Sequence, residues 1–390
     1  KRNIAIFGHN KVNGKKIYSQ GMKDIMDEID SNLNRIDYFN DPFALEKVEE
    51  LKAMKTAAEA LVHFANRYAK ELESLAKEEN RKWRKAELVK MAEICKRVPA
   101  HAPRDFHEAL QYYWFVHVGV ITETNPWDSF NPGRLDQHLY PFYKKGIEEG
   151  GLTEDKAKEL LQAFWIKFNN HPAPPKVGVT AQESNTYTDF TLINLGGLKE
   201  DGSDGVNELS YLILEVIEEM RLLQPGSMIQ ISKKNPDHFL KRALKIIKTG
   251  FGQPSIFNTD AIIPELLYQG KDIIDARNGG ASGCVESGAF GTESYILSGY
   301  FNLTKVLEIT LYNGVDPCSG KKIGLSTGDP EKFRTFNELM NAFKEQLNYF
   351  IDIKIKGNNI IQKLYEQQIP VPFLSLFIDD CIARGKDYNA

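Results

Sequence analysis

Short apolar runs alternate with amphipathic helical patterns along the middle of this chain, and this alternation is what most constrains the fold. The apolar runs cover residues 190–195, 227–231 and 254–257, and glycine or proline bounds them. A helical spacing of apolar residues lies between the first two runs, from Asn207 to Met220. Apolar strands separated by helices are typical of a sheet that is buried on both faces. The sequence therefore predicts an α/β fold.

The N-terminal region of the chain follows a different pattern. From Pro42 to Arg97, apolar residues recur at steps of three and four, and mixed charges occupy the positions between them. Prolines at 99 and 103 end this pattern. We therefore expect a mainly helical region over 1–104 and an α/β region over 105–390.

The next helix has a readable start at Asp105. An acidic side chain at this position caps the free backbone N–H groups of a first helical turn. Glu108 follows three residues later, which is the spacing of a capping box. A further helix is predicted after Thr153, because Glu154 and Asp155 would occupy its first turn, where the helix dipole favours anions.

Charge, cysteine content and hydropathy exclude several classes of protein. The formal net charge is −4, from 49 basic and 53 acidic residues, so nucleic acid is not expected as a partner. The four cysteines form no C-x-x-C pair, which argues against a metal site in this chain and favours free thiols in the reducing cytoplasm. No run of about 18 apolar residues occurs, so no membrane span is expected.

A glycine-rich stretch over 279–288 holds the residues most suited to chemistry. Four glycines and two serines are unfavourable inside a helix or strand, so we predict a loop with unusual backbone angles or close contacts. The stretch carries the thiol of Cys284 and, two residues on, the carboxylate of Glu286. A thiol can act as a nucleophile, a ligand or a hydrogen-atom carrier, and a carboxylate can transfer protons.

Three segments together resemble the glycyl radical enzymes of the pyruvate formate-lyase-like superfamily. They are Gly-Cys-Val-Glu at 283–286, Asn-Pro-Gly-Arg-Leu-Asp-Gln at 131–137 and Gly-Phe-Gly-Gln-Pro-Ser-Ile-Phe-Asn at 250–258. Their order and spacing match the family, and the similarity covers nearly all of the chain beyond about residue 104. The resemblance implies a barrel of ten strands, built from two parallel five-stranded halves and surrounded by helices.

The resemblance also implies how such an enzyme works. A radical stored on a backbone glycine near the C-terminus passes to the cysteine, here Cys284, and the resulting thiyl radical attacks the substrate. A separate activating enzyme, which uses S-adenosylmethionine and an iron–sulfur cluster, installs the glycyl radical under anaerobic conditions. Family members are often homodimers. The Arg-Val-x-Gly-Tyr type motif of the radical glycine is absent from this sequence. We therefore expect a fragment that lacks the C-terminal glycyl radical domain.

Within the superfamily, the residues around Cys284 favour one branch over two others. The acyltransferases use two adjacent cysteines, whereas Gly283 and Val285 flank Cys284. The diol dehydratases and C–N lyases usually have proline after the glutamate, whereas Ser-Gly-Ala-Phe-Gly follows here, at 287–291. That continuation is similar to the arylacetate decarboxylases, as are segments 170–175 and 184–197. A carboxy-lyase that converts an arylacetate to a methylarene and carbon dioxide is therefore expected.

The decarboxylase interpretation assigns roles to further residues. Cys284 forms the substrate radical and returns a hydrogen atom, while Glu286 engages the substrate carboxyl group or relays its proton. The resemblance implies that Ser129 bonds the carboxylate and that Phe190 packs on the ring; Trp127 and Tyr187 are candidates for an aromatic pocket. All eight histidines lie at or before His238, so no histidine after the glycine-rich loop can bond a phenolic hydroxyl. This favours indoleacetate over 4-hydroxyphenylacetate.

Two alternatives stay open at the level of sequence. One is a glycyl radical diol dehydratase or C–N lyase, which needs several polar groups around the substrate. The other, from a different class, is an inactive barrel that acts as a scaffold or binding module. Arg134 and Asp136 are interpreted as a structural ion pair or turn rather than as substrate ligands.

Overall fold

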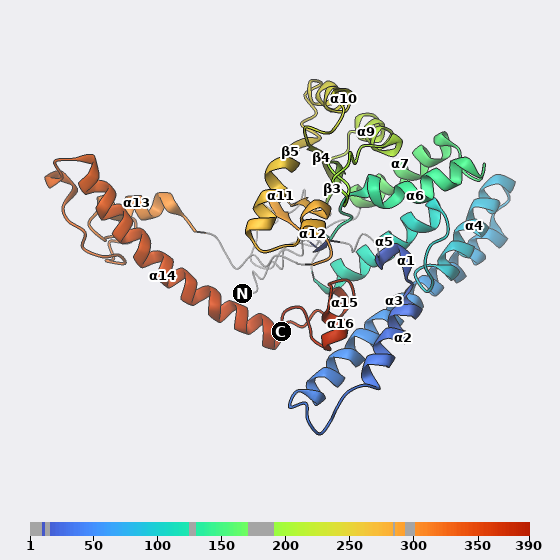
Figure 1. The fold of residues 1–390 in the computed structure, drawn as a ribbon, viewed down its shortest axis with the longest axis horizontal. Helices are drawn as coiled ribbons and strands as arrows, with labels where there is room; N and C mark the ends of the chain where they lie inside the picture. Colours follow the sequence, from blue (N-terminus) through green and yellow to red (C-terminus); the bar gives the residue numbers. More distant parts are fainter. Residues whose placement is uncertain (1–9, 12–15, 125–129, 171–190, 284, 293–300) are drawn as a thin grey trace. The chain divides into compact units, whose positions relative to one another are not determined.

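The computed structural model describes every residue except 1–9, 12–15, 125–129, 171–190, 284 and 293–300. The chain forms two compact units. Unit 1 contains Lys1–Ile296 together with Val371–Tyr388, and unit 2 contains Leu297–Pro370 together with Asn389–Ala390. Unit 1 holds the parallel sheet and the glycine-rich stretch (Figure 1).

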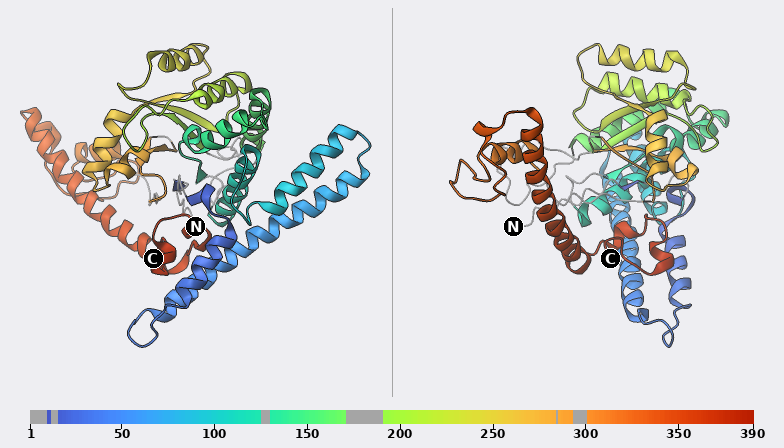
Figure 2. Two further views of the ribbon diagram at one scale, coloured as in Figure 1. Left: turned by 45° about the vertical axis from the view of Figure 1, so that its right-hand side comes forward. Right: turned by 60° about the vertical axis from the view of Figure 1, so that its left-hand side comes forward.

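Helices dominate the beginning of unit 1. They are α1 (Lys16–Ser19), α2 (Met22–Leu33), α3 (Ala44–Glu78) and α4 (Lys82–Arg97). α3 and α4 form a long hairpin, and α2 packs on α3 (Figure 2). Ala58, Ala65 and Ala69 are buried along α3, where small side chains allow a neighbouring helix to approach closely. The predicted helical character of the segment from Pro42 to Arg97 is confirmed.

The predicted helix start at Asp105 is confirmed, but the capping box is not. Oδ1 of Asp105 accepts a hydrogen bond from the Glu108 backbone N–H at 2.9 Å, at the start of α5 (Phe106–Glu123). The carboxylate of Glu108 instead accepts from the backbone N–H of Arg104 at 2.8 Å. The guanidinium of Arg104 bonds the same carboxylate. This explains why the Glu108 side chain reaches the backbone of Arg104, and not that of Asp105 as a capping box requires.

A three-stranded parallel sheet forms the centre of unit 1. Its strands are β3 (Leu192–Gly196), β4 (Gly226–Ile231) and β5 (Ser255–Asn258), hydrogen-bonded in that order. The crossover helices α9 (Glu208–Met220) and α10 (Asp237–Ile247) lie next to each other (Figure 1). Two successive crossovers of one hand place both helices on the same face of a sheet. The predicted strands and the helix after Asn207 are confirmed.

The remaining helices of unit 1 pack beside this sheet or on the helices at the beginning of the unit. They are α6 (Leu135–Glu148), α7 (Glu154–Asn170), α11 (Thr259–Tyr268), α12 (Ile273–Asn278), α15 (Pro372–Ser375) and α16 (Cys381–Arg384). α7 confirms the helix predicted after Thr153, and it packs against α9 and α5. Between α5 and α7 lies an aromatic cluster in which the ring of Tyr113 stacks on Phe130 and meets Phe164 edge-on.

The α/β class with a parallel sheet is confirmed, but the expected ten-stranded barrel is not formed by the described residues. These contain the three-stranded sheet, a two-stranded parallel pair of β1 (Asn10–Lys11) with β2 (Phe130–Asn131), and a two-stranded hairpin. A barrel closes only when both edge strands are paired. β5 ends the sheet on one side, and its Ile256 side chain is 45% exposed.

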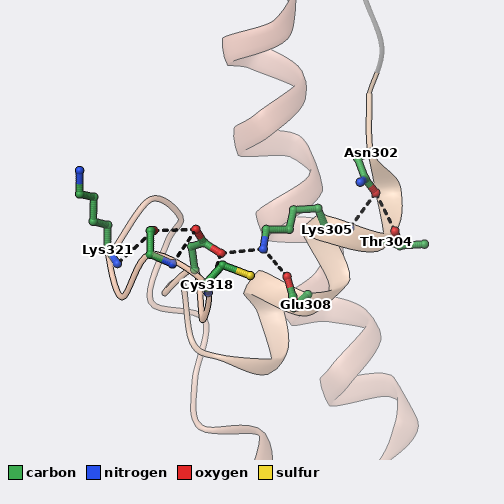
Figure 3. Close-up of polar contacts among 8 residues, drawn as sticks. Asn302, Thr304, Lys305, Glu308, Cys318 and Lys321 are labelled. Atoms are coloured by element: carbon green, nitrogen blue, oxygen red, sulfur yellow. Dashed lines mark hydrogen bonds and ion pairs between the residues drawn. The ribbon is translucent and has the colours of Figure 1, made fainter. Parts of the chain in front are cut away.

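Unit 2 is built on two helices, α13 (Leu303–Leu311) and α14 (Phe336–Gln368), which pack against each other, with a short 3-10 turn at Pro330–Lys332. Nζ of Lys305 on α13 donates to the carboxylates of Glu308 and Asp316, which ties the Cys318 loop to the helix (Figure 3). Among the described residues, none of the helices combines the length and the apolar character needed to cross a membrane.

Candidate active site

The glycine-rich stretch forms a β-hairpin rather than the predicted loop. β6 (Gly280–Ser282) pairs with β7 (Glu286–Gly288) in antiparallel register, with Ser282 opposite Glu286. Gly283 and Val285 lie in the turn that joins the two strands, and Gly283 adopts a φ of +56°, which favours glycine. The hairpin is built from backbone pairing, which is why small residues are sufficient to form it.

Glu286 lies at the turn end of this hairpin. Its carboxylate accepts a hydrogen bond from the backbone N–H of Val285 at 2.9 Å, and its backbone carbonyl accepts from the Ser282 hydroxyl at 3.3 Å. Val285 is 69% exposed, whereas Gly283 is buried, so Val285 is the accessible one of these two turn residues. Cys284 lies outside the described residues, and its assignment stays a prediction.

Close contacts with neighbouring atoms explain why glycine occupies positions 279 and 280, as predicted from the sequence. A Cβ atom on Gly280 would lie 2.4 Å from Oδ1 of Asn194 and 2.7 Å from the ring of Phe290. A Cβ atom on Gly279 would lie 2.5 Å from the side chain of Leu266. Real Cβ atoms do not come this close, so the hairpin fits against the sheet only with glycine at both positions.

The residues that follow Glu286 complete the hairpin and its packing. Ser287 and Gly288 pair with Ala281 and Gly280 across the two strands. Phe290 is buried against Gly133 and Gly280, where added Cβ atoms would lie 3.2 and 2.7 Å from its ring. The continuation Ser-Gly-Ala-Phe-Gly therefore has a structural explanation within the hairpin.

His138 lies beside the same glycine, since a Cβ atom on Gly133 would also be 3.2 Å from its ring. Its Nδ1 is 3.2 Å from the carbonyl oxygen of Pro132, to which it donates a hydrogen bond when that nitrogen carries the proton. Burial, and secondarily the charge of Arg134, lowers the pKa of His138 to about 4. The imidazole is therefore neutral near pH 7 and helps to hold the segment that leads into α6.

The other four predicted site residues, Ser129, Phe190, Trp127 and Tyr187, lie outside the described residues. A hydrogen bond nevertheless links the described residues that follow Ser129 and Phe190 in the chain. Oδ1 of Asn131, two residues after Ser129, accepts from the backbone N–H of Leu192, two residues after Phe190, at 2.7 Å. The segments that carry Ser129 and Phe190 thus continue into β2 and β3 at one place in the fold.

Arg134 and Asp136 are structural, as interpreted from the sequence. The buried guanidinium of Arg134 donates to the backbone carbonyl oxygens of Gly196, Leu198 and Arg277, the last at 2.7 Å. Burial lowers its pKa to about 10, which leaves it charged at neutral pH. Oδ2 of Asp136 accepts from the Gly196 backbone N–H at 2.8 Å and from the Ser210 hydroxyl at 2.5 Å. Burial raises the pKa of Asp136, which Ser210 and Arg134 oppose.

Sequence reasoning missed two buried amides, Asn194 on β3 and Gln230 on β4. Both are at most 1% exposed, and both bond the backbone of the segment that enters the hairpin. A polar side chain inside an otherwise apolar strand is the feature that could have identified them, because a buried amide needs partners. Among the residues that the structure describes, no group of three or more His, Cys, Asp or Glu side chains is placed to hold a metal ion.

The comparisons with known proteins place the chain in a family. Residues 5–390 match the model of the pyruvate formate lyase-like family, so the chain belongs to that family. This confirms the superfamily that the three sequence segments indicate. The chain spans about half the length of the curated relatives it matches.

The chain is 53% identical over 382 residues to a trans-4-hydroxy-L-proline dehydratase of Clostridioides difficile, which covers 98% of this chain and 48% of that protein. A crystal structure of hydroxyproline dehydratase from the same organism, with trans-4-hydroxy-L-proline bound, matches with a TM-score of 0.95 and 52% identity, covering 99% of this chain and 49% of that chain. An indoleacetate decarboxylase of Tractidigestivibacter scatoligenes is 31% identical over 373 residues, covering 94% of this chain and 42% of that protein.

The expected arylacetate decarboxylase, with indoleacetate as its substrate, is therefore wrong. Its main support was the continuation 287–291, in which Ser287 and Gly288 pair in the hairpin and Phe290 packs against Gly133 and Gly280, so these residues have a structural role. The histidine argument also fails. It compared only two arylacetate substrates and therefore could not detect an enzyme for a different substrate class. The lyase alternative is better supported by the relatives.

Proposed function

We propose that this chain belongs to a glycyl radical dehydratase that removes water from a hydroxylated cyclic amino acid of the 4-hydroxyproline type. The 53% identity to a trans-4-hydroxy-L-proline dehydratase, over almost the whole chain, carries the proposal. The identity to the indoleacetate decarboxylase is much lower, at 31%. Cys284 and Glu286 are the groups of this chain to which we assign the chemistry.

The proposed reaction balances as the loss of one water molecule. A glycyl radical, on a glycine outside this sequence, supplies the unpaired electron. Cys284 removes a hydrogen atom from the ring carbon next to the one that bears the hydroxyl group. The C–O bond breaks, a C=N bond forms, and the proton lost from the ring nitrogen leaves with the hydroxyl group as water. Glu286 relays that proton, and Cys284 returns the hydrogen atom to the ring.

The geometry of the hairpin supports this assignment. Val285 in the turn is largely exposed, so other groups can reach the hairpin at this residue. Glu286 lies directly beside the turn, through its bond to the Val285 backbone N–H. A radical donor and a substrate can therefore approach the same end of the hairpin. Acid–base and radical groups in one turn suit a reaction that moves a hydrogen atom and a proton at neighbouring positions.

Substrate contacts belong to the same proposal. We assign Ser129 to the substrate carboxylate, Phe190 to the face of the ring, and Trp127 and Tyr187 to the walls of the pocket. The bond between Asn131 and Leu192 supports a shared location for Ser129 and Phe190, because it joins the segments that follow them.

The proposal extends to the whole protein. It includes the ten-stranded barrel of two parallel halves, with the mainly helical region over 1–104 and the barrel region over 105–390 forming one catalytic domain. It also includes a C-terminal glycyl radical domain beyond this sequence, a radical S-adenosylmethionine activating enzyme as partner, and a homodimer. A cytoplasmic location follows from the free thiols, of which the structure describes Cys95, Cys318 and Cys381.

The test uses the full-length protein, activated anaerobically by its partner enzyme. Trans-4-hydroxy-L-proline, glycerol, isethionate and indoleacetate are offered separately, and products are identified by mass spectrometry. We expect a pyrroline carboxylate from hydroxyproline. If the protein shows a glycyl radical signal and dehydrates glycerol but not hydroxyproline, the proposed substrate class is wrong. The assignment as a glycyl radical dehydratase would then remain.

A further inference from the structure

Two carboxamide side chains seat the first strand of the hairpin on the parallel sheet. Nδ2 of Asn194 donates to the carbonyl oxygen of Ala281 at 2.8 Å, and its Oδ1 accepts from the Ala281 backbone N–H at 3.1 Å. Nε2 of Gln230 donates to the carbonyl oxygen of Gly279 at 3.0 Å. The amide of Asn194 thus bonds Ala281 at both backbone groups, as a neighbouring strand would.

The network of these two amides is complete. Oδ1 of Asn194 also accepts from Nε2 of Gln230 at 3.3 Å, and Oε1 of Gln230 accepts from the hydroxyl of Thr259 at 3.2 Å. The backbone N–H of Asn194 donates to the carbonyl oxygen of Gly133 at 3.0 Å. Because every member is satisfied, the network specifies one arrangement of the strands instead of tolerating several.

The surrounding face of the sheet is apolar, which makes the amides unusual. Leu192, Met228 and Ala281 form a buried cluster, with Phe257 packed against it. Side chains alternate along a strand, so Asn194 and Gln230 lie on the same face as Leu192 and Met228, two residues further along. Apolar residues would continue this cluster at no cost in desolvation, whereas buried amides must find partners. Their partners are the backbone groups of the hairpin.

We propose that Asn194 and Gln230 are positioning residues, which fix the register and depth of the hairpin that presents Cys284 and Glu286. This rests on the proposed function of those two residues. Ala281 lies one residue before Ser282, and Ser282 pairs with Glu286. A hairpin released from the amides shifts along the sheet and carries Glu286 with it. Small displacements of reacting groups, of the order of 1 Å, lower turnover by about 100-fold.

The test compares Asn194→Ala with a matched control, Asn235→Ala, in the full-length activated protein. Nδ2 of Asn235 donates to the carbonyl oxygen of Gly197 at 2.8 Å and to Asp204 at 2.6 Å. Its removal therefore also deletes partly buried amide hydrogen bonds, but these bonds hold the loop after β3 and not the hairpin. We expect kcat of Asn194→Ala to fall by about 100-fold with KM within about 3-fold, and the control to keep kcat within about 3-fold. Equal losses of kcat in both variants would overturn the proposal.

Two further measurements test the proposal if Asn194→Ala does not fold or the protein shows no activity. Gln230→Met preserves the approximate shape of the side chain and deletes its hydrogen bonds to Gly279, Asn194 and Thr259. It serves if Asn194→Ala does not fold, and a kcat like the wild type's would contradict the role of Gln230. Hydrogen exchange of the peptide containing Ala281 needs no activity. Its rate should rise by about 10-fold or more in Asn194→Ala and stay unchanged in Asn235→Ala.

The failure of the proposed function is distinguishable from the failure of this inference. If the wild-type protein dehydrates none of the substrates offered, the proposed function fails, and the exchange experiment alone decides the seating of the hairpin. Unchanged exchange at Ala281 in Asn194→Ala would then overturn the inference, whereas faster exchange restricted to the hairpin peptide would support it.

Discussion

The carboxylate of Glu123, at the end of α5, accepts a hydrogen bond from the backbone N–H of Phe373 at 2.7 Å. Its second oxygen accepts from the Leu374 N–H at 2.8 Å. The carboxylate thereby caps α15 and holds the segment Val371–Tyr388 on unit 1. Burial raises the pKa of Glu123 to about 7, although both backbone bonds act in the opposite direction.

We predict that this group makes stability fall as pH rises. Below the ordinary pKa of 4.5 the carboxyl group is protonated in both the folded and the unfolded state, so its titration does not change the free energy of unfolding. Between pH 4.5 and 7 the unfolded state releases the proton and the folded state keeps it, so folding becomes less favourable, by about 3 kcal/mol in total. Glu123→Gln cannot titrate. Denaturant unfolding from pH 5 to 8 should show the wild type losing stability relative to this variant; parallel profiles would contradict the assignment.

Gly280→Ala should destabilise the protein by about 1–3 kcal/mol, because the added methyl group meets Asn194, Gln230 and Phe290. Gly151→Ala is the control, since its added Cβ would have no neighbour within 4 Å and its φ is ordinary. We expect the control to change stability by less than about 1 kcal/mol. Thermal unfolding of both variants measures this, and similar melting temperatures would refute the close packing of the hairpin.

Arg134→Met should cost about 3–5 kcal/mol of folding free energy. The change leaves buried carbonyl oxygens, including that of Arg277, without a donor and the buried Asp136 without a nearby cation. Arg242→Met removes a partly exposed ion pair with Glu218 and should cost less than about 1 kcal/mol. Chemical denaturation of the two variants is the measurement; losses of equal size would show that Arg134 is not structural.

Cys284→Ser should abolish turnover while the protein remains folded, because the change is small and a serine hydroxyl does not carry the radical. Cys318→Ser is a matched control, since that thiol is exposed in unit 2. The control should retain the wild-type rate. Product formation by the activated full-length variants, together with circular dichroism, checks this prediction. Ordinary turnover by Cys284→Ser would remove the thiyl assignment.

Glu286→Gln should lower kcat by about 100- to 10,000-fold, because an amide cannot relay the proton. The hairpin should persist, since Gln can still accept from the Val285 backbone N–H. Substrate binding, measured calorimetrically, should change little. A rate near that of the wild type would exclude Glu286 from proton transfer.

Local patterns in the sequence were sufficient to predict the parallel strands β3, β4 and β5 and helices such as α9, but not the hairpin strands β6 and β7. The apolar spacing from Asn207 to Met220 predicted α9, and the apolar run 227–231 predicted β4. These patterns work because burial of one helical stripe or of a whole strand depends on residues close together in the chain. The order of three short segments was likewise enough to recognise the family. The ten-stranded barrel goes beyond what the described residues form.

Tertiary structure decided how the chemistry is held and corrected its interpretation. Asn194 and Ala281 are 87 positions apart, so no local pattern shows that one seats the other. Phe290 belongs to the continuation that favoured a decarboxylase in the sequence, yet it packs on the backbone at Gly133 and Gly280. The sequence by itself determined the main helices and the strands of the parallel sheet, and the family to which the chain belongs. Only the fold determined which groups meet, because hydrogen bonds and close packing depend on distances between segments that are remote in the chain.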